Sequence, residues 1–225
     1  MKKVYDQYGI LSFPGGNTGN QMGGWFKKEI NSVDDLAGLK MRIPGFAGEV
    51  LAKLGAKPTN IPPGELYTAL ERNTIDALEW VGPSLDLRMG FHKIAPYYYT
   101  GWHEPATELQ FMVNEKAYNK LPKDLQKILT IAMKTAAYDM YIQSYHESAE
   151  NLAALAKDYP NVKMRSFPEP VMNAIKAANM SLLKEFAAKD VVTAEILKSL
   201  NDYQAKARAW TNLSDRAYLD TSDKQ

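Results

Sequence analysis

The chain has 225 residues, of which 45% are hydrophobic and 24% are charged, a composition typical of a globular protein. Lys plus Arg number 27 and Asp plus Glu number 26, and no basic stripe is present, so no nucleic-acid partner is expected. The lack of cysteine excludes disulfides, thiolate metal sites and cysteine nucleophiles. No stretch of about twenty apolar residues occurs, and therefore no membrane-spanning helix is predicted.

Residues 4–80 alternate between strand and helix signals. We expect a first strand at 4–13, which Pro14–Gly16 should end, and a short strand at 25–27. The elements expected next are a capped helix start at 32–36, a strand at 39–44, a helix at 45–54, an extended segment at 57–61, a helix at 66–72 and a buried strand at 75–80. Short connections of this kind predict an α/β fold, in which ligands lie at the carboxyl ends of the strands of a parallel or mixed sheet.

The second half of the chain is mainly helical in its spacing. After a break rich in Gly and aromatic residues, the elements expected are a strand at 109–114, one long helix from 122 to 157, a strand at 162–167, helices at 171–188 and 193–210, and a loose tail from Asp215. We therefore predict an α/β ligand-binding domain with hinge strands at 1–115. The helical part at 116–225 should pack across both domains and contain one strand near 162–167.

Two charged residues stand at the ends of predicted strands. The guanidinium of Arg42 can bind a carboxylate through two parallel hydrogen bonds, although a surface arginine on a solvated strand edge is the alternative. Glu79 follows an apolar run, and a buried carboxylate there would need a cation or a basic partner, unless it simply emerges into solvent. His103 and Glu104 would point to opposite faces of a strand, so they are not expected to act as an acid–base pair.

Four motifs are distinctive: FPGGNTGNQMGGWF at 13–26, LAGLKMRIPG at 36–45, IDALEWVGP at 75–83 and YYTGWHEP at 98–105. In this order they resemble the receptor subunits (DctP type) of tripartite ATP-independent periplasmic (TRAP) transporters. The QMGG and EW segments are similar to the subgroup that takes 2-oxo acids and related monocarboxylates. The resemblance implies a periplasmic-binding-protein-like clamshell of two α/β domains, with mixed sheets and long C-terminal helices. It also implies that most of the first domain is missing from this chain.

The resemblance implies a binding role for Arg42 and Glu79, and also for residues that their positions alone do not identify. Arg42 would clamp the substrate carboxylate. A cation would be held by side-chain oxygens of Gln21 and Glu79 and by the backbone carbonyl of Trp80, and ligation by oxygen alone suits Na⁺ or Ca²⁺. Weaker candidates are Asn17 and Trp25 for the cleft wall and Glu104 for contact with ligand or cation.

The predicted function is therefore capture of a small 2-oxo or 2-hydroxy monocarboxylate, of the pyruvate, 2-oxobutyrate or lactate class, for delivery to a TRAP permease. No apolar secretion signal follows Met1–Val4, so a periplasmic location implies that the signal peptide and the N-terminal region are absent from this chain. A homodimer through the long helix is a further expectation. The alternatives are a different organic acid or sugar acid, or an enzyme that acts on a carboxylate with Glu79 as its base, although no enzyme motif supports the latter.

Overall fold

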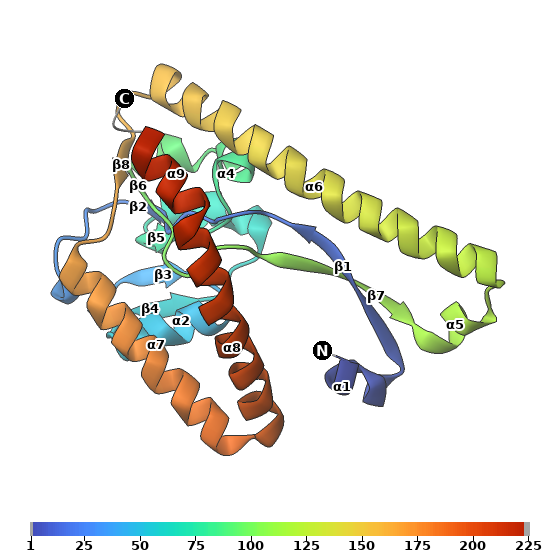
Figure 1. Ribbon diagram of the computed structural model, residues 1–225. Coiled ribbons are helices and arrows are strands. Elements are labelled where there is room, and N and C mark those ends of the chain that lie inside the picture. Colours follow the sequence, from blue (N-terminus) through green and yellow to red (C-terminus); the bar gives the residue numbers. More distant parts are fainter. Residues whose placement is uncertain (1, 223–225) are drawn as a thin grey trace. The chain divides into compact units, whose positions relative to one another are not determined.

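A sheet of six short strands forms the centre of the chain's first part (Figure 1). The computed structural model describes residues 2–222, and the strand order is β4-β3-β5-β2-β6-β8. β3 pairs in parallel with β4 and β5, and β6 pairs in parallel with β8, whereas β2 runs antiparallel to β5 and β6. The bounds are β2 Gly24–Phe26, β3 Lys40–Arg42, β4 Lys57–Thr59, β5 Ala77–Leu78, β6 Tyr97–Tyr99 and β8 Lys163–Arg165. The sheet is mixed, as predicted for an α/β fold.

Short helices connect the strands of this sheet. α2 spans Gly45–Lys53, α3 spans Leu66–Glu71 and α4 spans Pro83–Met89. The first two match the helices predicted at 45–54 and 66–72, because both segments repeat their apolar residues at helical spacing. α4 was not predicted, although Pro83 occupies a first-turn position where the missing N–H costs nothing.

A separate two-stranded antiparallel sheet is formed by β1 Ile10–Asn17 and β7 Glu108–Asn114. The predicted strand at 4–13 is wrong at its start, because α1 Lys2–Tyr5 and a 3₁₀ turn precede the strand. It is also wrong at its end, because a bulge after Pro14 lets the strand continue. Gly16 has φ 144°, and a Cβ there would collide with Met140 of the long helix, so only glycine fits.

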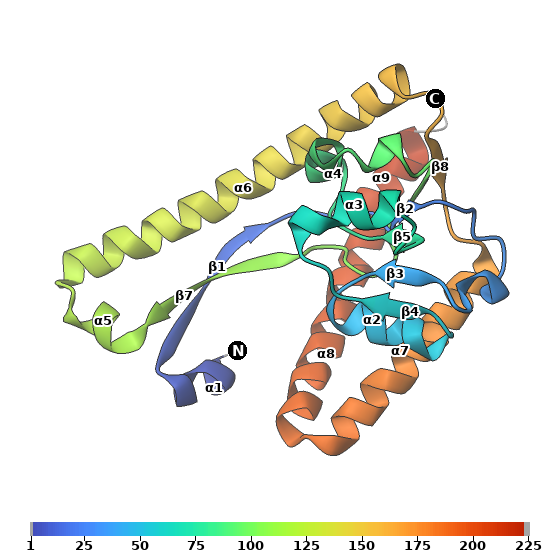
Figure 2. The ribbon, with the colours of Figure 1, turned by 180° about the vertical axis from the view of Figure 1, so that it is seen from behind.

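The long predicted helix is present as α6 Lys123–Asp158. It follows the short helix α5 Glu115–Lys120. α6 packs along β1 and against α4, and both ribbon views show it beside the β1–β7 sheet (Figures 1 and 2). None of the helices in the described part of the chain combines the length and hydropathy that spanning a bilayer requires.

The C-terminal helices are α7 Glu169–Lys189, α8 Val191–Leu213 and α9 Asp215–Ser222. The chain divides after residue 174 into two compact units, residues 1–174 and residues 175–225. The expectation of a loose tail from Asp215 is wrong as far as Ser222, because that segment is helical. Asp215 lies in the first turn of α9, where a carboxylate interacts favourably with the helix dipole.

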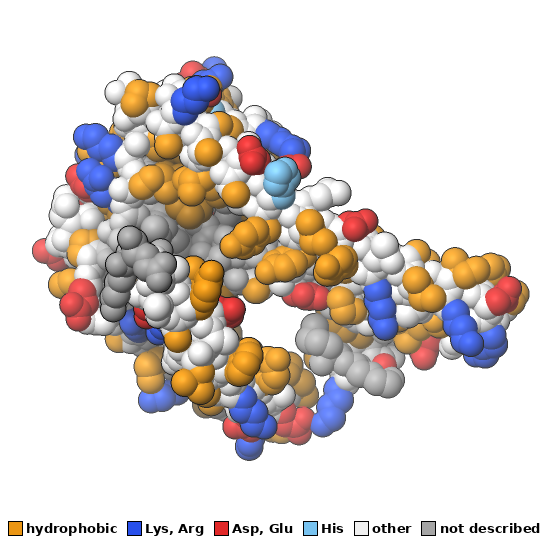
Figure 3. Space-filling model, turned by 45° about the horizontal axis from the view of Figure 1, so that its top comes forward, with side chains coloured by type: hydrophobic (Ala, Val, Ile, Leu, Met, Phe, Trp, Pro, Cys, Tyr) orange, Lys and Arg blue, Asp and Glu red, His pale blue; other side chains and the backbone are white. Residues whose placement is uncertain are grey.

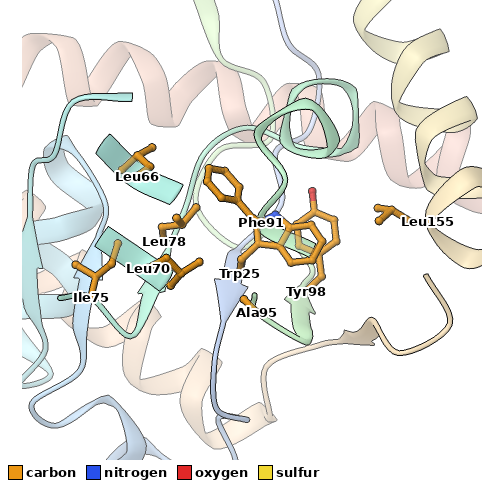
Figure 4. Close-up of a cluster of buried hydrophobic side chains, with 9 residues drawn as sticks. All are labelled: Trp25, Leu66, Leu70, Ile75, Leu78, Phe91, Ala95, Tyr98 and Leu155. Atoms are coloured by element: carbon orange, nitrogen blue, oxygen red, sulfur yellow. The ribbon is translucent and has the colours of Figure 1, made fainter. Parts of the chain in front are cut away.

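The core of the first unit gathers side chains from the sheet, from α3 and from α6 (Figure 4). The rings of Trp25 and Tyr98 stack with centroids 3.9 Å apart, and both side chains are fully buried. Trp25 therefore belongs to the core and not to a cleft wall, which corrects the sequence-based expectation.

The segment at 96–101, expected to be a break, contains β6, because the aromatic residues Tyr97–Tyr99 suit a pleated and buried strand.

Candidate functional site

Arg42 and Glu79 lie side by side at the carboxyl ends of two parallel strands. Arg42 ends β3 opposite Leu78 of β5, and the backbone N–H of Glu79 donates to the carbonyl of Arg42 over 2.9 Å. The Arg42 side chain also donates from Nη1 to the Glu79 carbonyl, and Nη1 lies 3.5 Å from the carboxylate oxygen Oε2 of Glu79. Sheet pairing thus brings together the two residues that the strand ends had suggested.

Both charges are almost fully removed from water. Arg42 is 7% exposed and Glu79 is 3% exposed. Burial lowers the pKa of the Arg42 guanidinium, and the nearby Glu79 carboxylate partly restores it. Neither residue satisfies all its polar atoms, because Arg42 Nε and Glu79 Oε1 are buried without a hydrogen-bond partner in the described structure. Each such atom costs about 1–3 kcal/mol, so the pair has unused binding capacity.

Backbone hydrogen bonds hold the segment of Gln21 close to the segment that follows Glu79. The N–H of Met22 donates to the carbonyl of Val81 over 2.9 Å, which sets Gln21 beside Trp80. The N–H of Gln21 donates to the carbonyl of Glu104, also over 2.9 Å. Three segments far apart in the sequence, around residues 21, 80 and 104, therefore meet. Gly101 makes this approach possible, because a Cβ there would collide with the carbonyl of Gln21.

The amide of Gln21 is held in one orientation. Its nitrogen donates to the hydroxyl of Thr18 over 3.1 Å and to the hydroxyl of Thr107 over 2.8 Å. Since both N–H bonds are used, the amide oxygen faces away from these threonines. The Thr107 hydroxyl in turn donates to the Glu104 carboxylate, so it connects Gln21 with a second acidic side chain. Sequence reasoning missed Thr107, which carries no signal of its own.

The segment 101–106 is a loop and not a strand, so the expectation that His103 and Glu104 point to opposite faces is wrong. Both side chains reach the site. The ring nitrogen Nε2 of His103 lies 3.8 Å from Glu79 Oε1, and the His103 side chain is only 5% exposed. The flanking Gly101 and Pro105 were the signal for a loop, because both residues favour turns over strand interiors.

Asn17 and Trp80 take less central positions. The Asn17 side-chain oxygen accepts a hydrogen bond from the Gly19 N–H over 2.8 Å and thereby forms a turn at the end of β1. The Trp80 ring lies beside the guanidinium of Arg42, with 5.2 Å from the guanidinium carbon to the ring centroid. Such cation–π contact helps to hold the arginine in place. The predicted ligand role of Asn17 stays a prediction.

Asp86 anchors the turn that follows Trp80. One oxygen of its carboxylate accepts hydrogen bonds from the N–H groups of Val81 and Gly82, over 3.0 and 2.9 Å. The other accepts from Trp25 Nε1 and the Tyr98 hydroxyl, each over 2.9 Å. The position of the Trp80 carbonyl is therefore fixed from the core, by a residue that sequence reasoning did not select. Burial raises the pKa of Asp86 to about 6, although these hydrogen bonds lower it.

The oxygen groups present fit a hard cation. An orphaned carboxylate oxygen on Glu79, the free end of the Gln21 amide and a backbone carbonyl at Trp80 are the ligand types that Na⁺ and Ca²⁺ prefer. Among the described residues, no group of three or more His, Asp or Glu side chains is placed to hold a metal. An ion here would therefore depend on amide and carbonyl oxygens and on an oxygen of the ligand.

Comparison with known families decides what kind of protein has this site. The model of the family described as bacterial extracellular solute-binding protein, family 7 (DctP), matches residues 1–190. The chain belongs to this family. Its members are periplasmic receptors of transporters and not enzymes. The motifs around residues 13–26, 36–45 and 75–83 had predicted this family, and the match confirms it.

Three relatives of this solute-binding protein are informative. A protein of Nostoc sp. (strain PCC 7120) named monocarboxylate 2-oxoacid-binding periplasmic protein is 39% identical over 219 residues, which cover 97% of this chain and 60% of that protein. A TRAP periplasmic solute-binding protein of Colwellia psychrerythraea, solved with calcium and pyruvate, is 86% identical with a TM-score of 0.97. One from Pseudoalteromonas atlantica T6c, solved with sodium and pyruvate, is 79% identical with a TM-score of 0.94.

Each of these two crystal structures is matched over 98% of this chain and 67% of its own length. The TRAP receptor fold predicted from the sequence, α/β with mixed sheets and long C-terminal helices, is thus confirmed. The chain spans 60% of the Nostoc relative's length.

The raised pKa of Asp86 gives a testable pH dependence. The folded state holds this proton up to about pH 6, whereas an ordinary aspartate loses it near pH 3.8. The stability that the group contributes is therefore present below pH 3.8 and lost as the pH rises towards 6. At 1.36 kcal/mol per pKa unit, the loss is about 3 kcal/mol.

Urea unfolding of the wild type and Asp86→Asn between pH 4 and pH 7 measures this effect. We expect the free energy of unfolding of the wild type to fall by about 2 kcal/mol relative to the variant between pH 4 and 6, and the difference to level off near pH 7. Parallel pH profiles would contradict the assignment, because the variant lacks the titrating group. A variant that is less stable than the wild type at every pH would be consistent with the assignment, since the asparagine cannot accept all four hydrogen bonds.

Proposed function

We propose that this chain is the ligand-binding part of a periplasmic TRAP receptor that captures a small 2-oxo or 2-hydroxy monocarboxylate together with Na⁺ or Ca²⁺. The ligands of the pyruvate, 2-oxobutyrate and lactate class would then be delivered to the TRAP permease. The observation that carries the proposal is the buried Arg42, whose Nε has no partner and whose Nη1 is already used by Glu79. The names of the three relatives, with their 2-oxo acids, calcium and sodium, support it.

The guanidinium geometry explains why an anion fits. Nη1 of Arg42 faces Glu79, so the opposite edge, formed by Nε and Nη2, is the fork that remains for a carboxylate. Two parallel charge-assisted hydrogen bonds from that edge would bind one planar carboxylate. Glu79 holds Arg42 in place, but its negative charge repels the same ligand. A bound cation would place positive charge between the Glu79 carboxylate and the carboxylate of the ligand. It would also coordinate the oxygen on C2 of the ligand.

Two alternatives remain to be separated by experiment. A different organic acid or sugar acid would use the same arginine fork, and the size of the ligand would then exceed three or four carbons. An enzyme with Glu79 as base is the weaker alternative. The Glu79 oxygen Oε2 lies 3.5 Å from Nη1 of the buried Arg42 guanidinium, so this carboxylate already serves to hold the arginine in place. We therefore propose a receptor that releases its ligand unchanged.

Calorimetric titration with pyruvate, 2-oxobutyrate and lactate, in sodium or calcium buffer, tests the ligand class. We expect the wild type to bind at least one of them and Arg42→Lys to bind it at least 10-fold more weakly, because lysine keeps the charge but loses the planar fork. Arg88→Lys is the matched control, since Arg88 is exposed and pairs with Glu147 away from the site. Equal affinities for wild type and Arg42→Lys would contradict the clamp, and a wild type that binds no organic acid would remove the function.

The cation site is tested by comparing two carboxylates. We propose Gln21, Glu79 and the Trp80 carbonyl as ligands, and Glu104 lies next to them through Thr107. Calcium titration in the presence of pyruvate should show at least a 10-fold loss of calcium affinity in Glu79→Gln. The exposed Glu49→Gln on α2 serves as control and should bind calcium like the wild type. A loss confined to Glu104→Gln would assign the ion to Glu104 and overturn the role of Glu79.

We further propose that the receptor forms a homodimer through α6. Large apolar side chains recur on one exposed stripe of this helix at intervals of three, four or seven residues, and Figure 3 shows hydrophobic side chains along the right-hand arm that contains α6. The exposed residues of the stripe are Ile128, Ile131, Tyr138, Ile142, Tyr145 and Leu152. A spacing of alternately three and four residues is the pattern of helices that pair along their length, so a second copy of this chain is the proposed partner.

Light scattering of the purified protein measures the oligomer. We expect the mass of a dimer for the wild type and the mass of a monomer for Tyr145→Asp, because a charge in the stripe would be buried on pairing. Tyr203→Asp on α8 is the matched control, since the two tyrosines are similarly exposed, at 70% and 72%. A monomeric wild type at micromolar concentration would contradict the proposal.

A further inference from the structure

His103 is a buried ring with unused hydrogen-bonding groups. Its side chain is 5% exposed, and both Nδ1 and Nε2 are buried without a hydrogen-bond partner among the described residues. Nε2 lies 3.8 Å from Glu79 Oε1, which also lacks a partner. A distance of 3.8 Å is too long for a hydrogen bond, so the two atoms face each other across a gap and do not satisfy one another.

The position of the ring is determined by its loop. The backbone of Glu104 accepts a hydrogen bond from Gln21, and Gly101 packs against the Gln21 carbonyl. The ring of Trp102 lies 4.8 Å from the His103 ring, measured between centroids. His103 is thus held beside Glu79 by three contacts of its own loop, and not by a hydrogen bond from its ring.

The gap between His103 and Glu79 has a defined hydrogen-bonding character. An imidazole can carry a hydrogen on Nε2, so this side of the gap can donate, while the carboxylate side accepts. One oxygen atom placed between them, off the line that joins them, can lie within about 2.8 Å of both. The other oxygen of the same Glu79 carboxylate neighbours the Arg42 guanidinium, whose unpaired Nε suits the carboxylate end of a ligand.

We propose that His103 is a ligand-binding residue that donates a hydrogen bond to the oxygen on C2 of the bound acid and thereby selects acids that carry such an oxygen. This proposal rests on the proposed function, in which Arg42 holds the carboxylate. The oxygen of a 2-oxo or a 2-hydroxy group accepts this hydrogen bond from His103, while the Glu79 carboxylate is left to the cation.

An acid without an oxygen on C2, such as propionate, would leave the buried His103 ring without a hydrogen-bond partner. Sites built to hydrogen-bond a polar group discriminate strongly against analogues that lack it, because their own buried groups then remain unsatisfied. The histidine would thus separate pyruvate and lactate from simple fatty acids, a distinction that the arginine fork alone cannot make.

The test is calorimetric titration of pyruvate, lactate and propionate, in calcium buffer, into the wild type, His103→Leu and His103→Gln. We expect His103→Leu to bind pyruvate and lactate about 5- to 10-fold more weakly, the range for one lost hydrogen bond, and to bind propionate no more weakly than the wild type does. His103→Gln, which keeps an N–H donor near the position of Nε2, should retain most of the affinity. The exposed His146→Leu on α6 is the control and should behave like the wild type.

The ratio of pyruvate to propionate affinity is the decisive readout, because a merely structural role of His103 would weaken all three acids alike. An unchanged ratio in His103→Leu, while the wild type still binds pyruvate, would overturn the role of His103 and leave the receptor function intact. A wild type that binds none of the three acids would overturn both. If His103→Leu does not fold, His103→Asn replaces it, since the shorter amide cannot place a donor at Nε2 and should lose selectivity relative to His103→Gln.

Discussion

The ion pair between Arg42 and Glu79 is the constraint on which the rest of the site depends. Two buried charges are stable only when they neutralise each other and their remaining polar atoms find partners. Parallel pairing of β3 and β5 supplies the first condition, since it sets both residues at the same edge of the sheet. The remaining polar atoms do not all find partners in the described structure, because Arg42 Nε and Glu79 Oε1 have no hydrogen bond. A ligand with an anionic end and a bound cation would supply these partners.

The surrounding structure holds this pair in a fixed frame. Asp86 draws the turn after Trp80 towards the core with two backbone hydrogen bonds, and Trp25 and Tyr98 bind the same carboxylate from within the core. The segment that contains Gln21 is held beside the site by two backbone hydrogen bonds, from Gln21 to Glu104 and from Met22 to Val81. Because the ligand groups are held by the core and not by flexible side-chain contacts, the free energy of binding is not spent on ordering them.

The sequence predicts the part of the fold that follows from periodicity and the part of the site that follows from strand ends. The helices at 45–54, 66–72 and 122–157 were predicted because their apolar residues repeat at helical spacing. Arg42 and Glu79 were selected because each is a charged residue at the end of a predicted strand. The roles of Gln21 and Trp80 came only from the family resemblance, since a loop amide and a backbone carbonyl have no pattern of their own.

Long-range contacts decide the features that the sequence did not reveal. The first strand passes through Pro14 because a bulge and the contact of Gly16 with Met140 permit it, and neither is a local signal. His103 faces Glu79 only because its loop is bound to Gln21, which lies about eighty residues earlier in the chain. Asp86 was missed for the same reason, since its four hydrogen bonds come from three separate segments.

A crystal structure of the protein grown with pyruvate and calcium tests the central claim most directly. The account predicts a planar three-carbon acid whose carboxylate lies on the Nε edge of Arg42, with an ion bound by oxygens of Gln21, Glu79 and Trp80 beside its C2 oxygen. Density for the acid away from Arg42, or an Arg42 whose Nε edge is closed by another protein group in that crystal, would contradict it.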